Sequence, residues 1–256
     1  MEKFTLRAPL SSRRLGISLG VDLVTPKSCP LDCIYCEAGR TTLLTAERRS
    51  FFPLDEVKSA LKSYLDTAPK LDSITFSGRG EPTLSSDFFA VVKFIRENYP
   101  HYKLTLLTNG IFLGEADVIA AASMLDLVIP SFDGSNESEF FRIDRPAPGV
   151  NFNVYRKNLV SFCRKFAEKI KLEIFLVPGI NDTPGSLARF VALAQEIEPL
   201  AVQVNTLDRP GTENDIVIPS ARSAELFAAR ISEVCDVELL IRHQVIFIKH
   251  QTENRQ

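Results

Sequence analysis

Short apolar runs alternate with longer amphipathic stretches along most of the chain. The apolar runs are rich in β-branched residues and nearly continuous, as expected for strands that are covered on both faces. They predict six strands, at residues 17–24, 73–77, 103–108, 125–131, 171–177 and 201–206. Helical patterns lie between and after them, at residues 54–66, 86–98, 115–122, 152–168, 185–197 and 220–234. This order is typical of an α/β fold built from βα units, with a parallel sheet and helices outside it.

One domain accounts for the whole pattern. A chain of 256 residues is an ordinary size for a single α/β barrel, and no repeat, low-complexity tract or linker divides it. We therefore predict a single domain over residues 1–256, with a core at about residues 15–235 and extensions at both ends. The apolar run at residues 237–250 predicts an additional strand or hairpin.

Loops rich in small or polar residues follow the predicted strands at their C-terminal ends. They cover residues 25–40, 77–83, 108–110, 131–135, 177–182 and 205–211. Ligands of parallel α/β proteins bind at that edge of the sheet. The loops therefore predict one active site to which several strands contribute.

Composition narrows the class of protein. Hydrophobic residues make up 45% of the chain and charged residues 24%, which is typical of a globular protein with a sizeable core. No apolar stretch reaches the roughly 18 residues of a membrane span, and the first residues lack the apolar core of a signal peptide. We therefore expect a cytoplasmic protein without a membrane partner. The net charge of −2 provides no global attraction for nucleic acid, although residues 1–50 carry eight basic and five acidic side chains.

Three of the five cysteines, Cys29, Cys33 and Cys36, lie within eight residues on the loop after the first predicted strand. This crowding is unlike a disulfide framework, and thiolates at such spacing suit zinc or an iron–sulfur cluster. A structural zinc site and an ordinary electron-transfer cluster both want four protein ligands, but Cys163, Cys235 and the histidines show no matching spacing. We interpret Cys163 and Cys235 as buried apolar residues. Three ligands would leave one iron open to an exogenous ligand, as in catalytic metal centres.

The run Cys29-Pro-Leu-Asp-Cys33-Ile-Tyr-Cys36 resembles the CX3CX2C motif of the radical S-adenosylmethionine (SAM) superfamily. The resemblance implies a [4Fe-4S] cluster on these three cysteines, whose fourth iron binds the amino and carboxylate groups of SAM. Reductive cleavage of SAM would then yield methionine and a 5'-deoxyadenosyl radical that abstracts hydrogen from a substrate. The resemblance also implies a partial (βα)6 TIM-like barrel and an electron donor such as flavodoxin or ferredoxin.

Further strand-end residues are similar to SAM-binding positions of that superfamily, in the same order along the chain. Tyr35 matches an aromatic position whose backbone lies near the adenine. Gly80, Glu81 and Pro82, preceded by Ser77 and Gly78, resemble the stretch that would hold the SAM amino group, although Glu81 could also only cap its loop. The resemblance implies contacts with the ribose or the methionyl carboxylate for Thr108, Asn109, Ser131 and Asp133, and packing against adenine for Val177 and Pro178.

The segments SSRRLGISLGVDLVTPKSCPLDCIYCEAGRTT, FSGRGEPTL and QVNTLDRPG resemble a narrower group. These are stand-alone Fe-S oxidoreductases related to the tRNA wyosine-forming radical SAM proteins. The sequence departs from the wyosine synthases because it lacks the upstream cysteines that hold a second cluster in archaeal forms.

Three hypotheses for the substrate remain open. The first is an RNA base or another nucleobase compound, which the related group and the basic residues Arg13, Arg14, Arg40, Arg48 and Arg49 favour. The second is a protein or peptide, including activation of a glycyl radical enzyme. The third is no substrate at all, with the cluster serving as a redox or regulatory module.

The loop after the last strand is the candidate substrate contact, through Asn205, Asp208 and Arg209. Asp208 and Arg209 could equally form an ion pair with each other that shapes the loop. We expect residues 1–16 and 237–256 to cover the mouth of the open barrel.

Overall fold

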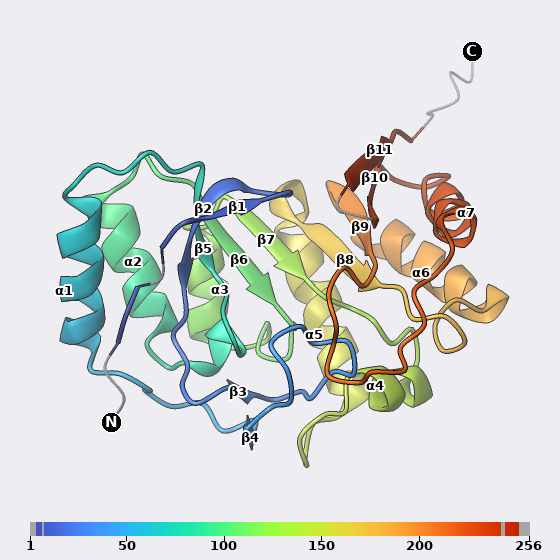
Figure 1. Cartoon of the computed structure of the whole chain (residues 1–256), viewed down its shortest axis with the longest axis horizontal. Coiled ribbons are helices and arrows are strands. Elements are labelled where there is room, and N and C mark those ends of the chain that lie inside the picture. The colour runs from blue at the N-terminus through green and yellow to red at the C-terminus, as the bar shows by residue number, and fades with distance from the viewer. Residues whose placement is uncertain (1–3, 7, 242–243, 251–256) are drawn as a thin grey trace.

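A curved, mostly parallel sheet forms the centre of the molecule (Figure 1). The computed structural model describes residues 4–6, 8–241 and 244–250. Six parallel strands occur where the apolar runs predict them: β2 (Gly16–Val21), β5 (Ser73–Phe76), β6 (Leu104–Thr108), β7 (Leu127–Pro130), β8 (Lys171–Phe175) and β9 (Ala201–Asn205). They lie side by side in this order, with a junction between β7 and β8.

The junction between β7 and β8 joins two halves of the sheet. Parallel bridges connect Val128 with Ile170 and Ser131 with Glu173, and the Phe132 amide donates to the Glu173 carbonyl at 2.9 Å. These contacts are sparser than the regular ladders on either side, so the sheet bends here. The six strands therefore form one wall of a partial barrel.

Short strands extend the wall at both ends. β1 (Leu10–Ser12) pairs antiparallel with β2, β10 (Val237–Ile241) pairs parallel with β9, and β11 (Gln244–Ile248) pairs antiparallel with β10. The hairpin predicted in the C-terminal run is thereby confirmed, and its first strand is an additional parallel strand. Within the described chain, β1 and β11 are the two edges, and the barrel is open between them.

Helices cover the outside of the sheet (Figure 1). They are α1 (Leu54–Leu65), α2 (Phe88–Asn98), α3 (Ala116–Ala122), α4 (Glu137–Ile143), α5 (Phe152–Lys165), α6 (Pro184–Ile197) and α7 (Ala221–Ile231). The helix predicted at 152–168 ends early, and a 3-10 turn (Ala167–Lys169) replaces its last part. None of the helices in the described residues has the length and apolar character that a bilayer crossing requires.

The sequence prediction missed α4. Its start carries a capping signal, because the Asn136 side chain accepts from the Glu139 amide at 3.1 Å and donates to the Glu139 carboxylate at 2.7 Å. An Asn followed three residues later by Glu is a recognisable N-terminal signature. The helix is only seven residues long, so its apolar periodicity is too short to stand out.

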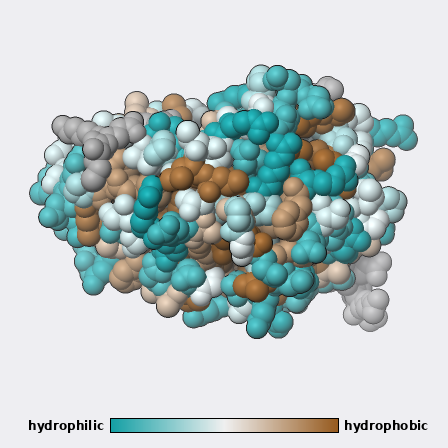
Figure 2. All heavy atoms as spheres, turned by 90° about the horizontal axis from the view of Figure 1, so that it is seen from below, coloured by the Kyte–Doolittle hydropathy of each residue, from teal (hydrophilic) through white to brown (hydrophobic). Residues whose placement is uncertain are grey.

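The core fills the space between the sheet and the helices. Phe190 of α6 is fully buried, and its ring meets those of Phe132 and Phe227 at centroid distances of 6.4 and 6.0 Å, both nearly edge to face. Such aromatic contacts add to the free energy gained from removing apolar surface from water. Seen from below, the surface shows apolar residues in separate groups among hydrophilic ones (Figure 2).

Replacement of Phe190 by Ala should lower the free energy of unfolding by about 3–5 kcal/mol, because it leaves a cavity between α6, α7 and the sheet. Leu226→Ala is the control, since Leu226 on α7 is 60% exposed and should contribute within about 0.5 kcal/mol. Urea unfolding of the metal-free protein, followed by circular dichroism, measures both. Equal losses in the two variants would contradict this account of the core.

Candidate active site

The loop that carries the three cysteines is held by backbone pairing on one side. β3 (Ser28–Cys29) pairs in parallel with β4 (Leu43–Leu44), and the amides of Thr42 and Leu43 both donate to the Lys27 carbonyl at 3.0 Å. The Thr45 amide donates to the Cys29 carbonyl at 3.0 Å. The chain therefore returns alongside the first cysteine and fixes its backbone.

The end of α4 holds the other side of the same loop. The Asp32 amide donates to the Asp144 carbonyl at 3.0 Å, and the Ile34 amide donates to the Ile143 carbonyl at 2.9 Å. The Ala147 amide donates in turn to the Pro30 carbonyl at 2.8 Å. These bonds join backbone to backbone, so the end of α4 and the residues after it support the cysteine loop on both sides of Cys33.

All three cysteines line one cavity of about 640 Å³ at the carboxyl ends of the parallel strands. Five of the six predicted strand-end loops contribute to its wall, whereas the loop at 177–182 does not. Strand β8 itself contributes Glu173 and Phe175 in its place. The expectation of one site shared by several strand ends is confirmed, with this exception.

Each cysteine sulfur meets a different polar side chain. Asn109 Nδ2 donates to Cys29 Sγ at 3.4 Å, Lys27 Nζ donates to Cys36 Sγ at 3.2 Å, and Cys33 Sγ donates to Asp144 Oδ1 at 3.4 Å. Amide and ammonium donors favour negative charge on a sulfur. Two of the three sulfurs are thus placed beside groups that suit a thiolate bound to iron.

Burial makes the free thiols reluctant to ionise. It raises the pKa of Cys29 to about 12, with the carboxylate of Glu81 acting in the same direction. Burial also raises the pKa of Cys33, and Asp144 adds to that effect. Iron must therefore displace protons when it binds these sulfurs.

The loop after β5 packs directly on the cysteine loop. The Glu81 amide donates to the Ser28 carbonyl at 3.2 Å, and a Cβ on Gly80 would lie 2.0 Å from that carbonyl oxygen. A Cβ on Gly78 would lie 2.2 Å from the carboxylate carbon of Asp22. Gly80 is therefore required by its close approach to backbone, whereas Gly78 faces the end of a side chain that can shift. Pro82 then begins a 3-10 turn (Pro82–Leu84) behind the loop and does not line the cavity.

The carboxylate of Glu81 is almost completely used within the protein. The side chain is 2% exposed and accepts from the Thr83 amide at 3.0 Å, the Thr108 hydroxyl at 2.7 Å and the Asn109 amide at 2.8 Å. The Thr83 hydroxyl also donates to it, at 2.5 Å. Glu81 thus caps its own loop and holds the end of β6, so that Asn109 faces the sulfur of Cys29.

Tyr35 stacks on Phe175 with the ring centroids 3.8 Å apart and the planes 7° from parallel. Its hydroxyl donates to Asp133 Oδ2, and Asp133 Oδ1 accepts from the Phe175 amide at 2.6 Å. Burial raises the pKa of Asp133 to about 7, against the effect of these bonds. Asp133 therefore fixes the aromatic pair from behind, whereas both rings line the cavity.

The predicted SAM contacts divide into two groups. Tyr35, Ser77, Gly78, Gly80, Glu81, Thr108, Asn109 and Ser131 line the cavity, but Pro82, Asp133, Val177 and Pro178 do not. Val177 belongs to a small apolar cluster with Ile34, Ile143 and Phe175, beneath the aromatic pair. Val177, which was predicted to pack against adenine, does not line the cavity, whereas Phe175, which the sequence prediction did not include, does.

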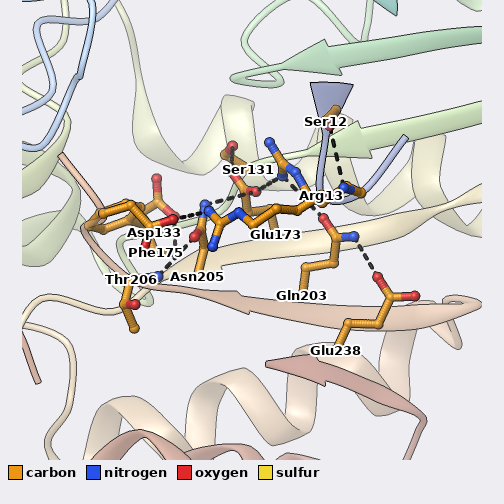
Figure 3. Close-up of polar contacts among 12 residues, drawn as sticks. Ser12, Arg13, Ser131, Asp133, Glu173, Phe175, Gln203, Asn205, Thr206 and Glu238 are labelled. Carbon is orange, nitrogen blue, oxygen red and sulfur yellow. Dashed lines mark hydrogen bonds and ion pairs between the residues drawn. The ribbon is translucent and has the colours of Figure 1, made fainter. Parts of the chain in front are cut away.

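A chain of polar contacts crosses the interior (Figure 3). Glu173 accepts from Ser131 and Asn205, both at 3.3 Å, and pairs with Arg14. Arg14 also donates to Gln203 at 3.3 Å, and Gln203 donates to Glu238 at 2.6 Å. Glu173 on β8 and Gln203 and Asn205 on β9 occupy alternate strand positions, which face the interior. The sequence shows this alternation of polar and apolar residues, so it could have indicated these three positions.

The substrate candidates Asn205, Asp208 and Arg209 all line the cavity. The ion pair expected between Asp208 and Arg209 is wrong, because Asp208 pairs with Arg13 and Arg209 lies 3.7 Å from Glu37. Residues 10–14 also line the cavity, as predicted for the N-terminal segment. The C-terminal segment does not cover the mouth in its described part, since β10 and β11 extend the sheet; residues 251–256 lie outside the described chain.

Five arginines of the N-terminal fifth, all within the described chain, make specific contacts. Arg13 and Arg14 pair with Asp208 and Glu173 inside the cavity, and Arg40 lies 2.8 Å from Glu213. Arg48 pairs with Asp117 at 2.7 Å, and the Arg49 guanidinium lies over the Phe51 ring at 5.0 Å. Four of these five arginines thus have carboxylate partners, which leaves less positive charge to attract an RNA backbone.

The donor set fits an iron–sulfur cluster better than a single metal ion. In the described chain no group of three or more histidine, cysteine, aspartate or glutamate side chains is gathered tightly enough to hold one ion. A cluster binds each thiolate to a different iron and so accepts sulfurs that are further apart. Cys163 and Cys235 are buried away from the cavity, as predicted.

Comparison with known proteins identifies the family. The sequence profile of the radical SAM superfamily matches residues 23–191, which include the three cysteines and the loop after β5. A UPF0026 protein of Synechocystis is 31% identical over 205 residues, which cover 79% of this chain and 75% of that protein. A protein of Brachyspira hyodysenteriae named GTPase Obg is 34% identical over 201 residues, which cover 78% of this chain but only 29% of that protein. A GTP 3',8-cyclase of Limosilactobacillus fermentum is 28% identical over 158 residues, 60% of this chain and 44% of that protein.

Solved structures share the fold. A radical SAM methyltransferase from Sphaerobacter thermophilus superposes with a TM-score of 0.62 at 18% identity, covering 87% of this chain and 66% of that one. TYW1 with a lysine-pyruvate adduct bound superposes with a TM-score of 0.57 at 15% identity, covering 93% and 80%. The partial TIM-like barrel is thereby confirmed. The profile match over more than half of the chain and the UPF0026 relatives show that this protein belongs to the radical SAM superfamily of enzymes.

Proposed function

We propose that this protein holds one [4Fe-4S] cluster on Cys29, Cys33 and Cys36 and uses it to cleave SAM reductively. The products would be methionine and a 5'-deoxyadenosyl radical that abstracts hydrogen from a substrate. The carrying observation is that all three cysteines line the same cavity as the strand-end residues of β5, β6, β7 and β9. When bound, the cluster supplies one electron to the sulfonium of SAM, and a flavodoxin or ferredoxin would supply that electron to the cluster.

The residues of the chain contribute orientation rather than acid–base chemistry. Glu81 holds Thr108 and Asn109 at the end of β6 beside the first cysteine. The stacked rings of Tyr35 and Phe175 offer an apolar surface on which the adenine of SAM would lie. Residues 10–14 cover part of the open side, which limits the access of water to a reactive intermediate.

A small nucleobase compound is the substrate that the opposite wall favours. Arg14, Glu173 and Asn205 present planar guanidinium, carboxylate and carboxamide groups, the kind that pair with base edges. The paired arginines offer no free cationic track for an RNA backbone, so the base itself would be the recognised part. The similarity to a GTP 3',8-cyclase agrees with a nucleobase compound.

Cys33→Ala should abolish the formation of 5'-deoxyadenosine and reduce the iron content well below about four per chain, because a ligand is lost. The protein is reconstituted anaerobically with iron and sulfide, reduced and given SAM, and the product is measured by chromatography. Cys163→Ala is the matched control, since Cys163 is buried in the core away from the cavity and should keep both properties. If wild-type protein binds about four irons but forms no 5'-deoxyadenosine with reductant present, the cluster would be a redox or regulatory module instead.

Gly80→Ala should weaken SAM binding by about tenfold or more, because the added Cβ would meet the Ser28 carbonyl at 2.0 Å and move the loop away from the cysteines. Gly20→Ala on β2 is the control, because its Cβ would have nothing within 4 Å. Equilibrium dialysis with labelled SAM on reconstituted protein measures both. Equal affinities in the two variants would show that the contact between these loops does not shape the SAM site.

Guanosine and adenosine nucleotides should accelerate the formation of 5'-deoxyadenosine more than an unstructured peptide or a folded tRNA does. Asn205→Ala should remove the acceleration by the nucleotide but keep the slow reaction without substrate, because Asn205 lines the cavity and its carboxamide binds Glu173 rather than a cysteine. Initial rates with each compound provide the measurement. Acceleration by the peptide alone would favour a protein substrate, and acceleration by tRNA alone would favour RNA.

A further inference from the structure

Lys27 is a buried cation without a carboxylate partner. Its residue is 7% exposed, and its Nζ donates to the Gly39 carbonyl and to Cys36 Sγ, the latter at 3.2 Å. No ion pair of Lys27 with an acidic side chain occurs within the described part of the chain. Arg14, another basic side chain that lines the cavity, does have a carboxylate partner, Glu173.

A buried ammonium group needs a counter-charge. Removing it from water costs several kcal/mol unless an anion lies close by. The carbonyl of Gly39 satisfies one of its three protons but carries no net charge. Within the described residues, no carboxylate pairs with Lys27, and the other group that its Nζ contacts is the sulfur of Cys36 at 3.2 Å.

We infer that Lys27 is the electrostatic counter-ion of the iron–sulfur cluster and makes its reduction more favourable. This inference rests on the proposed binding of a cluster by Cys36. Reduction adds one negative charge to the cluster, and a fixed cation beside a ligating sulfur stabilises the reduced form more than the oxidised form. Lys27 is thus a positioning residue that acts through Cys36, and it does not touch SAM or the substrate in this role.

The surroundings of the other two sulfurs support a specific role for Lys27. Cys29 meets the neutral amide of Asn109, and Cys33 meets Asp144. A carboxyl group and a carboxamide carry no positive charge in any protonation state found in proteins. The single cation in contact with a cysteine sulfur, within the residues described, is therefore Lys27.

The backbone of Lys27 is also well placed to hold the charge still. Its carbonyl accepts from the amides of Thr42 and Leu43, both at 3.0 Å, and the Gly39 amide donates to the Cys36 carbonyl at 3.0 Å. The side chain of Lys27 is therefore held at both ends, by the backbone bonds of its own residue and by the contacts of its Nζ with Gly39 and Cys36. A fixed charge stabilises an anion without the cost of ordering a mobile side chain.

The test compares the reduction potentials of Lys27→Met, Lys27→Gln and Lys27→Arg, measured by electron paramagnetic resonance during anaerobic redox titration without SAM. In the Met and Gln variants, the equilibrium constant for cluster reduction should be about tenfold lower than in wild type. For a one-electron couple this corresponds to a midpoint potential about 59 mV more negative. The Arg variant should stay within about twofold of wild type, because it keeps the charge. Lys93→Met is the control, since Lys93 lies on the exposed side of α2 and pairs with Glu97 at 3.7 Å.

Iron and sulfide contents of the same samples separate the outcomes. If Met and Gln bind a full cluster with unchanged potential, the inference is overturned while the proposed function stands. If Met and Gln lose the cluster and Arg keeps it, the counter-charge is needed for cluster binding itself, which supports the inference. If Arg loses the cluster as well, the role of Lys27 is one of shape and the inference fails. If wild-type protein binds no cluster, the proposed function fails first.

Discussion

The close contact between two loops is the constraint on which the site depends. The Glu81 amide donates to the Ser28 carbonyl, one residue before the first cysteine, and Gly80 has no room for a side chain at that contact. One backbone hydrogen bond thus fixes the end of β5 relative to the cysteine loop. The side chain of Glu81 transmits the same alignment to β6, because it binds Thr108 and Asn109. Three strand ends therefore take their positions from a contact that involves few side chains.

Electrostatics in the cavity follow from pairing rather than from net charge. The chain carries −2 overall, and its N-terminal basic residues are spread over many positions in the sequence. In the fold, Arg13 and Arg14 turn inward and meet carboxylates from distant strands, whereas Lys27 meets a cysteine. Charges in a low-dielectric interior interact far more strongly than those on the surface. The strongest charge interactions around the cavity are therefore those of Arg13, Arg14 and Lys27 with their buried partners.

Much of the fold could be predicted from the sequence, because continuous apolar runs and amphipathic helices have a clear period. All six predicted strands are present, and the strand-end loops meet as parallel topology requires. The short helix α4 was missed, although a capping signal at Asn136 was present. The site was harder to predict where its side chains belong to strands. Glu173 and Phe175 are two residues apart on β8 and therefore lie on the same face of the sheet. Which of the two faces lines the cavity depends on how the sheet bends. Partners such as Asp208 for Arg13 are set by tertiary packing across almost the whole length of the chain, which local sequence cannot show.

The support of the cysteine loop by α4 and β4 is made of backbone atoms. Main-chain bonds at Asp32 and Ile34 involve no side-chain atoms, so these hydrogen bonds do not depend on which side chains the two positions carry. Exposed side chains around the loop can therefore change while these hydrogen bonds keep the three sulfurs in place. A family built on this arrangement can diversify its protein contacts and conserve its chemistry at the same time.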